Sequence, residues 1–296
     1  MLTKIMHRIN HYFLRKRNQD RFNKAITDKL PSNLHELMAF SYKKKLDGIN
    51  LKLGDKVEQL RASIVENNFG KKVKTFGSPH SNTELFDING RVIPGGFNDR
   101  DIKGVARTGT NAFGGIQLKK ILDAFGPGTV IELGTNTGLS GCYFLSSKNV
   151  KELITIEGSP DLCQIAQSNL IQFGSNFKII NCLFDDAITQ MEAEGRRFQY
   201  AFIDGQHEKK ATIHYMERLI PLLTEGAVLI FDDIYWSEDM NDAWIQIKGD
   251  PRFDLCIDFG WRGICRLSAK SMNIHERLFF DLTEYHGRPL IQRPGW

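Results

Sequence analysis

The order of apolar segments in this 296-residue chain predicts an α/β fold, a mostly parallel sheet with helices on both faces. From about position 113 onward, short runs rich in Val and Ile alternate with segments of helical period. One run, at 129–133, breaks into a turn bounded by Gly134 and Gly138 and resumes as an apolar helical segment. A strand, a glycine loop and a helix in this order form the ligand-binding unit of such sheets.

The segments after position 110 define the expected core of the fold. Strands are predicted at residues 129–133, 153–157, 177–181, 200–204, 227–232, 253–259 and 263–267. Helices are predicted at residues 115–125, 139–147, 160–173, 186–194, 209–223 and 239–249. The last two strands are joined by Gly260-Trp261-Arg262 as a hairpin. Residues 111–268 are therefore predicted to form one domain, and residues 269–296 an extension that docks on it or on a neighbouring chain.

Residues 1–110 are predicted to form a separate region of basic helices followed by an irregular cap. Residues 1–45 contain 11 Lys and Arg against 3 Asp and Glu, so the rest of the chain is net negative although the total charge is +4. Apolar residues at three- and four-residue steps predict an amphipathic helix there: Leu2, Ile5, Met6, Ile9, Tyr12 and Phe13. Such a helix can lie on an anionic membrane or hold nucleic acid, but packing on its own domain or on a dimer mate is favoured.

Two more helices are expected in this region, one around residues 34–42 and one from about Asp55. Residues 69–110 are rich in Gly and lack a sustained period, apart from short β-like pieces at 72–76 and 90–93. A long irregular connection in a compact protein is usually a functional lid or a disordered linker, and the position of this segment just ahead of the predicted domain at residues 111–268 makes it the candidate cap over a substrate. His80 and Arg107 within it are candidate site residues, with ordinary surface positions as the alternative.

Composition limits the class of protein. Hydrophobic residues make up 41% and charged residues 25%, which suits a soluble globular protein with a full core. No run approaches the ~20 apolar residues of a membrane span, and the N-terminus lacks the apolar region of a secretory signal. The five cysteines form no Cys-x-x-Cys pair, so neither a disulfide framework nor a zinc site is expected. These features favour a reduced, cytoplasmic protein.

The glycine loop and the acid after the next strand indicate what the sheet binds. Gly134 and Gly138 would let the backbone approach a ligand, and the following helix would point free amides toward it. Glu157 ends the next strand, nineteen positions after Gly138, where an acid accepts hydrogen bonds from ribose hydroxyls. Asn136 stands where a dinucleotide fingerprint requires a glycine, so the loop argues against NAD and favours an adenosyl cofactor.

Four motifs, each at a predicted strand end, resemble those of class I S-adenosylmethionine-dependent methyltransferases. They are Glu132-Leu133-Gly134 with Gly138, Ile156-Glu157-Gly158, Phe202-Ile203-Asp204-Gly205-Gln206-His207 and Phe231-Asp232-Asp233-Ile234. Over about residues 113–267 the chain is most similar to the O-methyltransferase branch with an Asp-Gly-x-His motif.

This resemblance implies a Rossmann-like sheet of seven strands with an antiparallel last strand, and S-adenosylmethionine as cofactor. Cofactor contacts are expected from Glu132, Gly134, Thr135, Asn136, Gly138, Glu157, Gly158, Phe184, Asp185 and Asp204. Asp186 is an alternative to Asp185 as acceptor from the adenine amino group.

Three carboxylates, Asp204, Asp232 and Asp233, converge at one edge of the predicted sheet. They repel one another unless a cation lies among them, and Mg²⁺ held by their oxygens is the simplest cation. The alternative is structural, with Asp232 or Asp233 capping the next helix and Asp204 shaping a turn. The similarity to metal-dependent macrolide-sugar O-methyltransferases favours the ion.

His207 lies three residues after Asp204 and is the candidate general base. Methyl transfer to a hydroxyl requires removal of its proton, which a histidine can accept at neutral pH. The alternative is a histidine that caps the helix expected from position 209. The resemblance favours the base, with Asp204 as the second catalytic residue. Trp236 is expected to contact the substrate and Trp244 to pack in the core.

The predicted function is S-adenosylmethionine-dependent methylation of a hydroxyl on a small molecule or sugar. One alternative is a non-catalytic interaction protein that binds the cofactor and works through its basic N-terminal helix. Another is a nucleic-acid methyltransferase, although the chain has no Asn-Pro-Pro-Tyr-type motif after the strand at 200–204. Nucleic acid is therefore not the expected partner, membrane contact through residues 1–30 is not favoured, and a homo-oligomer stays open.

Overall fold

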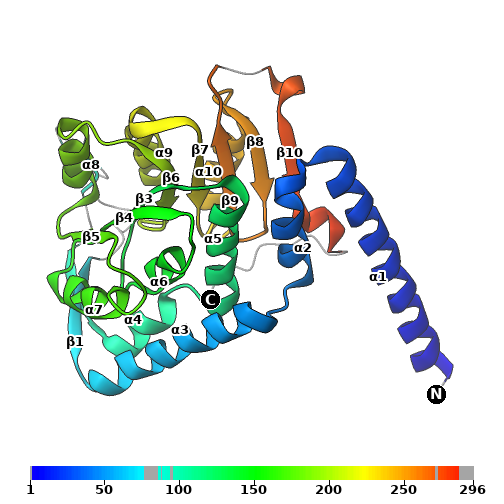
Figure 1. The fold of residues 1–296 in the computed structure, drawn as a ribbon, viewed down its shortest axis with the longest axis horizontal. Helices are drawn as coiled ribbons and strands as arrows, with labels where there is room; N and C mark the ends of the chain where they lie inside the picture. Colours follow the sequence, from blue (N-terminus) through cyan, green and yellow to red (C-terminus); the bar gives the residue numbers. More distant parts are fainter. Residues whose placement is uncertain (1, 77–85, 88, 94–95, 271–272, 287–296) are drawn as a thin grey trace.

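The computed structural model describes residues 2–76, 86–87, 89–93, 96–270 and 273–286, and in it one large sheet is covered by helices on both faces (Figure 1). The strands of this sheet are β3 (Gly128–Leu133), β4 (Val150–Ile156), β5 (Phe177–Ile180), β6 (Phe198–Ile203), β7 (Leu223–Phe231), β8 (Phe253–Asp258), β9 (Gly263–Leu267) and β10 (Leu278–Asp281). The helices around it are α5 (Ala112–Phe125), α6 (Leu139–Leu145), α7 (Pro160–Leu170), α8 (Phe184–Ala193), α9 (Lys209–Leu219) and α10 (Glu238–Gly249). The predicted α/β fold is confirmed, and all seven expected strands are present.

The strand order is β10-β8-β9-β7-β6-β3-β4-β5. Among the described strands of this sheet, β9 alone runs antiparallel to its neighbours, β7 and β8, as the predicted hairpin requires. β3 pairs with β4 on one side and with β6, which comes later in the chain, on the other. The order therefore reverses at β3, and the loops after β3 and β6 lie together at the ligand-binding edge of such sheets.

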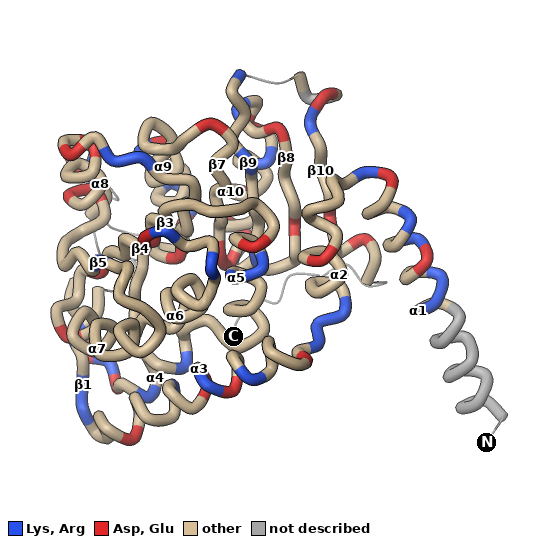
Figure 2. The backbone as a smooth tube through the Cα atoms, in the orientation of Figure 1, with Lys and Arg blue, Asp and Glu red and all other residues tan. Residues whose placement is uncertain are grey.

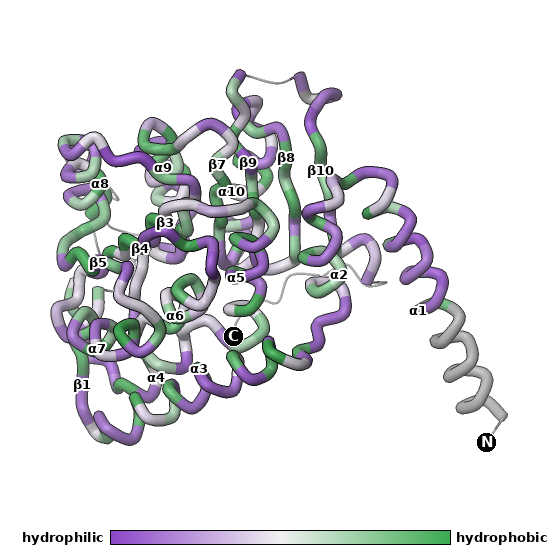
Figure 3. Tube along the Cα trace, in the orientation of Figure 1, coloured by the Kyte–Doolittle hydropathy of each residue, from purple (hydrophilic) through white to green (hydrophobic). Residues whose placement is uncertain are grey.

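The two faces of the sheet carry separate hydrophobic clusters. Val130 of β3 belongs to the cluster with α5, α6 and α7, whereas its neighbour Ile131 belongs to the cluster with α8, α9 and α10. Successive residues of a strand point to opposite faces. Both side chains are fully buried because helices cover both faces of the sheet. A strand buried on both faces reads as a continuous apolar run, which explains the pattern at 129–133. Figure 3 shows the same concentration of hydrophobic residues along the strands.

The sheet contains one strand more than the seven predicted, because β10 adds to the edge formed by β8 in parallel register. β10 is four residues long, too short to carry a clear period of its own, and the open edge of β8 decides its pairing. The turn that follows it, Leu282–Tyr285, packs against the first helix of the chain, with the Phe22 and Tyr285 rings 5.8 Å apart. The described part of the predicted extension, residues 273–286, thus docks on its own chain.

The described chain begins with the α-helices α1 (Leu2–Lys29), α2 (His35–Lys43) and α3 (Gly48–Asn67). The end of α1 buries Phe22 and Ile26 in the cluster shared with α5, while its N-terminal part extends away from the body (Figure 1). Figure 2 shows basic and acidic residues side by side along the described part of α1. None of the described helices is both long and apolar enough to cross a membrane.

The described parts of segment 69–110 contain two strands and a helix. The expected piece at 72–76 forms β1 (Lys72–Phe76), which pairs antiparallel with β2 (Phe97–Asp101). The piece expected at 90–93 makes only an isolated bridge between Phe86 and Val92. A helix that the sequence did not indicate, α4 (Ile102–Thr108), follows β2. Asp101 caps it by accepting from the Lys103 amide at 2.8 Å, a local signal hidden among the glycines.

All five cysteines are free thiols. Cys142, Cys256 and Cys265 are buried, and Cys163 and Cys182 are half-buried.

Candidate active site

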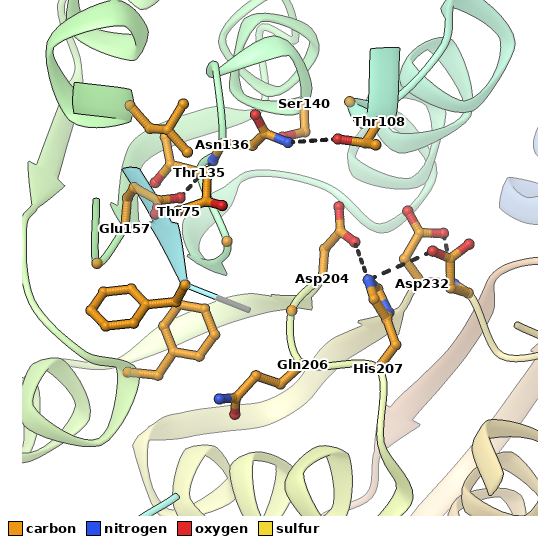
Figure 4. Close-up of a pocket in the computed structure, with 18 of the residues that line it drawn as sticks. Thr75, Thr108, Thr135, Asn136, Ser140, Glu157, Asp204, Gln206, His207 and Asp232 are labelled. Atoms are coloured by element: carbon orange, nitrogen blue, oxygen red, sulfur yellow. Dashed lines mark hydrogen bonds and ion pairs between the residues drawn. The ribbon is translucent and has the colours of Figure 1, made fainter. Parts of the chain in front are cut away.

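A cavity of ≈ 1780 Å³ opens where β3, β4, β6 and β7 end (Figure 4). Most of the predicted site residues line it: Gly134, Thr135, Asn136, Glu157, Gly158, Phe184, Asp185, Asp204, His207, Asp232 and Asp233. The predicted cap also contributes to the wall through Thr75, Phe76, Arg91, Val92, Arg100 and Arg107. Glu132 and Gly138, both expected at the cofactor, are not on this wall.

The loop after β3 turns sharply at Gly134, whose φ of +103° favours glycine. A Cβ there would lie 2.1 Å from the carbonyl oxygen of Asp204, so the loops after β3 and β6 touch. The Asn136 amide donates to Glu157 Oε2 at 2.9 Å. Asn136 Oδ1 and Thr137 Oγ1 are buried and have no hydrogen-bond partner among the described residues. Two unpartnered oxygens in a loop on the cavity wall indicate a ligand with hydrogen-bonding groups.

Glu132 and Gly138 support this loop from behind. Ser140 Oγ donates to one carboxylate oxygen of the fully buried Glu132, and Thr155 Oγ1 donates to the other at 2.7 Å. Burial raises the pKa of Glu132 to about 7, although the two hydroxyls act to lower it. Gly138 starts α6 with φ +83°, and a Cβ on it would lie 3.2 Å from Ala166 of α7. Both residues thus contact other parts of the protein, and their expected cofactor contacts stay a prediction.

Glu157 lies on the cavity wall, close to Thr75 of the cap (Figure 4). Its second oxygen accepts from the Ser159 amide at 2.9 Å. Burial raises the pKa of Glu157, against the backbone amides that lower it. Next to it, a Cβ on Gly158 would lie 2.4 Å from the ring of Phe76, so an aromatic side chain of the cap occupies this space.

Asp185 is fixed by the protein itself. Its Oδ1 accepts from His214 Nε2 at 2.7 Å and from an Arg218 Nη1 at 2.9 Å, and its Oδ2 accepts from the Val92 amide at 2.9 Å. Burial acts to raise the pKa of Asp185, but these hydrogen bonds and charges outweigh it and hold the pKa below its usual range. Both oxygens of Asp185 therefore already accept hydrogen bonds from the protein, and its contact with an adenine amino group stays a prediction. The alternative, Asp186, forms an ion pair with Arg91 at 2.9 Å.

The acids after β6 and β7 surround His207. His207 Nε2 lies 3.8 Å from Asp204 Oδ1 and 3.7 Å from Asp233 Oδ2, as Figure 4 shows for Asp204. One ligand atom from each of these three residues can be chosen within 4.8 Å of the others, a spacing that a metal ion can bridge. Burial and the neighbouring carboxylates raise the pKa values of Asp204 and Asp233.

The helix-capping alternatives for these residues are wrong. Ser237 caps α10 by accepting from the Met240 amide, so neither Asp232 nor Asp233 does. The first turn of α9 has no side-chain cap at its N-cap residue, and the Lys209 amide donates to Asp239. The acids and His207 are thus free of these structural roles.

Asp232 differs from the other two acids because Arg262 holds it. Arg262 Nη2 donates to Asp232 Oδ2 at 2.7 Å, and its Nη1 donates to the carbonyl oxygen of Gly114 at 2.8 Å. The Arg262 side chain is 1% exposed and its Nε has no partner among the described residues. Sequence analysis treated Arg262 only as part of a hairpin turn. The signal that could have found it was the need for a cation among three carboxylates.

The remaining candidates occupy three kinds of position. Trp236 is 46% exposed on the cavity wall, with its ring 6.3 Å from that of His207. Trp244 is buried as predicted, and its Nε1 donates to Asp258 Oδ2 at 2.7 Å. Arg107 lines the cavity, whereas His80 lies outside the described residues.

Comparison with known families matches residues 131–234 to the model of a methyltransferase domain. The matched segment begins in β3 and ends just after Asp233, so it includes the glycine loop, Glu157 and the acids around His207. No protein in a search of curated proteins matches the chain.

Three solved structures illustrate the similarity to known folds. An O-methyltransferase from Bacillus cereus in complex with SAH is 19% identical, over 73% of this chain and 90% of that chain, with a TM-score of 0.48. The O-methyltransferase TomG from Streptomyces achromogenes in complex with SAM is 17% identical, over 54% and 82%, with a TM-score of 0.46. A SAH-bound methyltransferase from Podospora anserina is 16% identical, over 55% and 81%, with a TM-score of 0.45.

Proposed function

We propose that this protein is an S-adenosylmethionine-dependent O-methyltransferase that acts on a hydroxyl of a small molecule or sugar. The observation that carries the proposal is the pairing, on one cavity wall, of a glycine loop with unpartnered oxygens and a histidine between two carboxylates. The methyltransferase-domain match, which spans both features, supports it. The domain division is part of this proposal: residues 111–268 form the cofactor-binding domain, residues 1–110 the basic helical region with the cap, and residues 269–296 a C-terminal extension.

The residues of the loop fit the parts of such a cofactor. Asn136 Oδ1 and Thr137 Oγ1 can pair with its amino-acid end, and the lone pairs left on Glu157 can accept from ribose hydroxyls. When bound, S-adenosylmethionine supplies a sulfonium methyl group whose C–S bond breaks as the new C–O bond forms.

His207 is proposed as the general base that accepts the proton of the acceptor hydroxyl. Its Nε2 lies 3.8 Å from Asp204 Oδ1 and 3.7 Å from Asp233 Oδ2, so the two carboxylates can fix the orientation of the ring. Positioned acid–base groups contribute about 10²–10⁴-fold to rate. Trp236 beside it would provide an apolar surface for the acceptor.

A divalent cation, Mg²⁺, is proposed at Asp204 and Asp233. Two carboxylates with ligand atoms within 4.8 Å fit such an ion, whereas the Oδ2 of Asp232, the third predicted ligand, is bonded to Arg262. A bound cation would orient the acceptor oxygen and favour loss of its proton.

Calorimetric titration of S-adenosylhomocysteine tests the cofactor. The wild-type protein should bind it in the micromolar range, and Mg²⁺ should give a separate heat that is lost in Asp204→Ala. Absence of binding in the folded wild-type protein would contradict the proposed function.

Turnover of sugar and phenol acceptors, followed through release of S-adenosylhomocysteine, tests the base. His207→Ala should lower kcat by about 10²–10⁴-fold while the affinity for S-adenosylhomocysteine stays unchanged. His275→Ala, on an exposed turn, is the matched control and should keep full activity. Full turnover in His207→Ala would remove the base from the proposal.

A further inference from the structure

The hairpin β1–β2, which belongs to the predicted substrate cap, lies against the part of the cavity next to Glu157. The ring of Phe76, the last residue of β1, occupies the space that a side chain at Gly158 would need, with ring atoms 2.4 Å and 2.6 Å from a Cβ built there. Phe76 and its neighbour Thr75 both line the cavity. Figure 4 shows Thr75 beside Glu157.

Several contacts fix the position of β1. Lys74, two residues before Phe76, is held at both backbone groups: its amide donates to Asp161 Oδ2 at 3.1 Å, and its carbonyl oxygen accepts from Ser159 Oγ. Both partners lie at the start of α7, directly after Glu157 and Gly158. On the outer side, the ring of Phe97 from β2 lies 4.0 Å from that of Phe76 between centroids. Phe76 is therefore a pre-positioned ring on the wall.

A second ring belongs to the same end of the cavity. Phe184, at the start of α8, packs on Gly205, where a Cβ would lie 2.7 Å from the ring. Phe184 also lines the cavity. Asp185 at this end already accepts hydrogen bonds from His214, from Arg218 and from the Val92 amide, so aromatic surface is the main further contact that this end of the cavity offers to a base.

We propose that Phe76 forms the aromatic wall of the nucleoside half of the cofactor site, so that the N-terminal region completes this site. The inference rests on the proposed function, because it assumes that an adenosyl cofactor occupies the cavity. A flat base gains affinity from contact with an aromatic face whatever its hydrogen-bond pattern. In this proposal β1, the first strand of the segment 69–110 that was expected to cover the substrate, contacts the cofactor instead.

Calorimetry with S-adenosylhomocysteine and with 5′-methylthioadenosine tests this role. Phe76→Ala should raise the Kd for S-adenosylhomocysteine about tenfold, the lower part of the range for loss of an aromatic contact with a base. The Kd for 5′-methylthioadenosine should rise by the same factor, because this ligand has the nucleoside but lacks the amino-acid end. Phe76→Trp should retain the wild-type affinity.

Phe69→Ala is the matched control, since Phe69 lies just before β1 and is 89% exposed, and its Kd values should equal the wild-type ones. If Phe76→Ala does not fold, Phe76→Leu keeps an apolar side chain without the ring and should still weaken binding several-fold. Unchanged affinity in a folded Phe76 variant overturns the inference and leaves the proposed function intact. A loss for S-adenosylhomocysteine without a loss for 5′-methylthioadenosine also overturns it. Failure of the wild-type protein to bind either ligand overturns both.

Discussion

Beneath the glycine loop, Glu132 accepts hydrogen bonds from two hydroxyls, whereas at the ends of β6 and β7 three aspartates face a histidine and an arginine. Behind the first end of the cavity, the buried carboxyl of Glu132 has only neutral hydrogen-bond donors, and burial raises its pKa. At the second end, the guanidinium of Arg262 pairs with Asp232, whereas Asp204 and Asp233 lie beside His207.

This difference distinguishes an acid that supports the structure from acids that are available to a ligand or a substrate. An acid satisfied by neutral groups, as Glu132 is, stabilises a loop and has little to offer a substrate. Carboxylates that remain close together without full compensation attract a cation or a proton. The reactive end of the cavity is therefore expected at Asp204, His207 and Asp233, and the binding end at the glycine loop.

Removing the positive charge of Arg262, at the second end of the cavity, should have the largest effect on stability. Arg262→Met leaves Asp232 as a buried, unpaired charge and should lower the free energy of unfolding by about 3–5 kcal/mol. Arg266→Met is the matched control on β9, the strand that begins directly after Arg262. Arg266 pairs with Asp254 at a half-exposed site, so this substitution should cost less than about 1 kcal/mol. Denaturant unfolding measures both, and equal losses would contradict the special role of Arg262.

The proton held by Glu132, behind the first end of the cavity, should make the free energy of unfolding depend on pH. The pKa of Glu132 is raised from 4.5 to about 7, so the folded state keeps a proton that the unfolded state releases. Its contribution to the free energy of unfolding is largest below the unfolded value and falls by about 1.4 kcal/mol per pH unit as pH rises toward 7. Glu132→Gln should remove this slope.

Denaturant unfolding at several pH values between those limits measures the slope. Glu152→Gln, a half-exposed position on β4, is the control and should keep it. A slope that survives in Glu132→Gln would mean that Glu132 is not the group responsible.

The smallest effect is expected at the binding end itself. Glu157→Gln replaces one of two oxygens that accept from backbone amides of Asn136 and Ser159, and it removes the charge available to ribose hydroxyls. Affinity for S-adenosylhomocysteine should fall about tenfold by calorimetry, as expected for loss of a hydrogen bond to a charged group. Glu225→Gln, at an exposed position of β7, should leave it unchanged. Unchanged affinity in Glu157→Gln would contradict the ribose contact.

Sequence analysis succeeded where local pattern and burial agree. The strands β3 to β9 are buried on both faces or alternate regularly, so their apolar runs were recognisable, and so was the glycine loop at Gly134. It missed α4 because its cap at Asp101 lies in a glycine-rich segment, and it missed β10 because an edge strand of four residues carries little pattern.

The sequence by itself determined the α/β sheet, the glycine loop and the order in which the acids and His207 follow the strands. Only the tertiary structure decided which of these groups are free, because that depends on partners far away in the chain. Arg262 reaches Asp232 across 30 positions, Val92 reaches Asp185 across 93, and Phe76 reaches Gly158 from another region. Local periodicity reports burial and secondary structure, whereas charge compensation and close packing are set by contacts that no local pattern records.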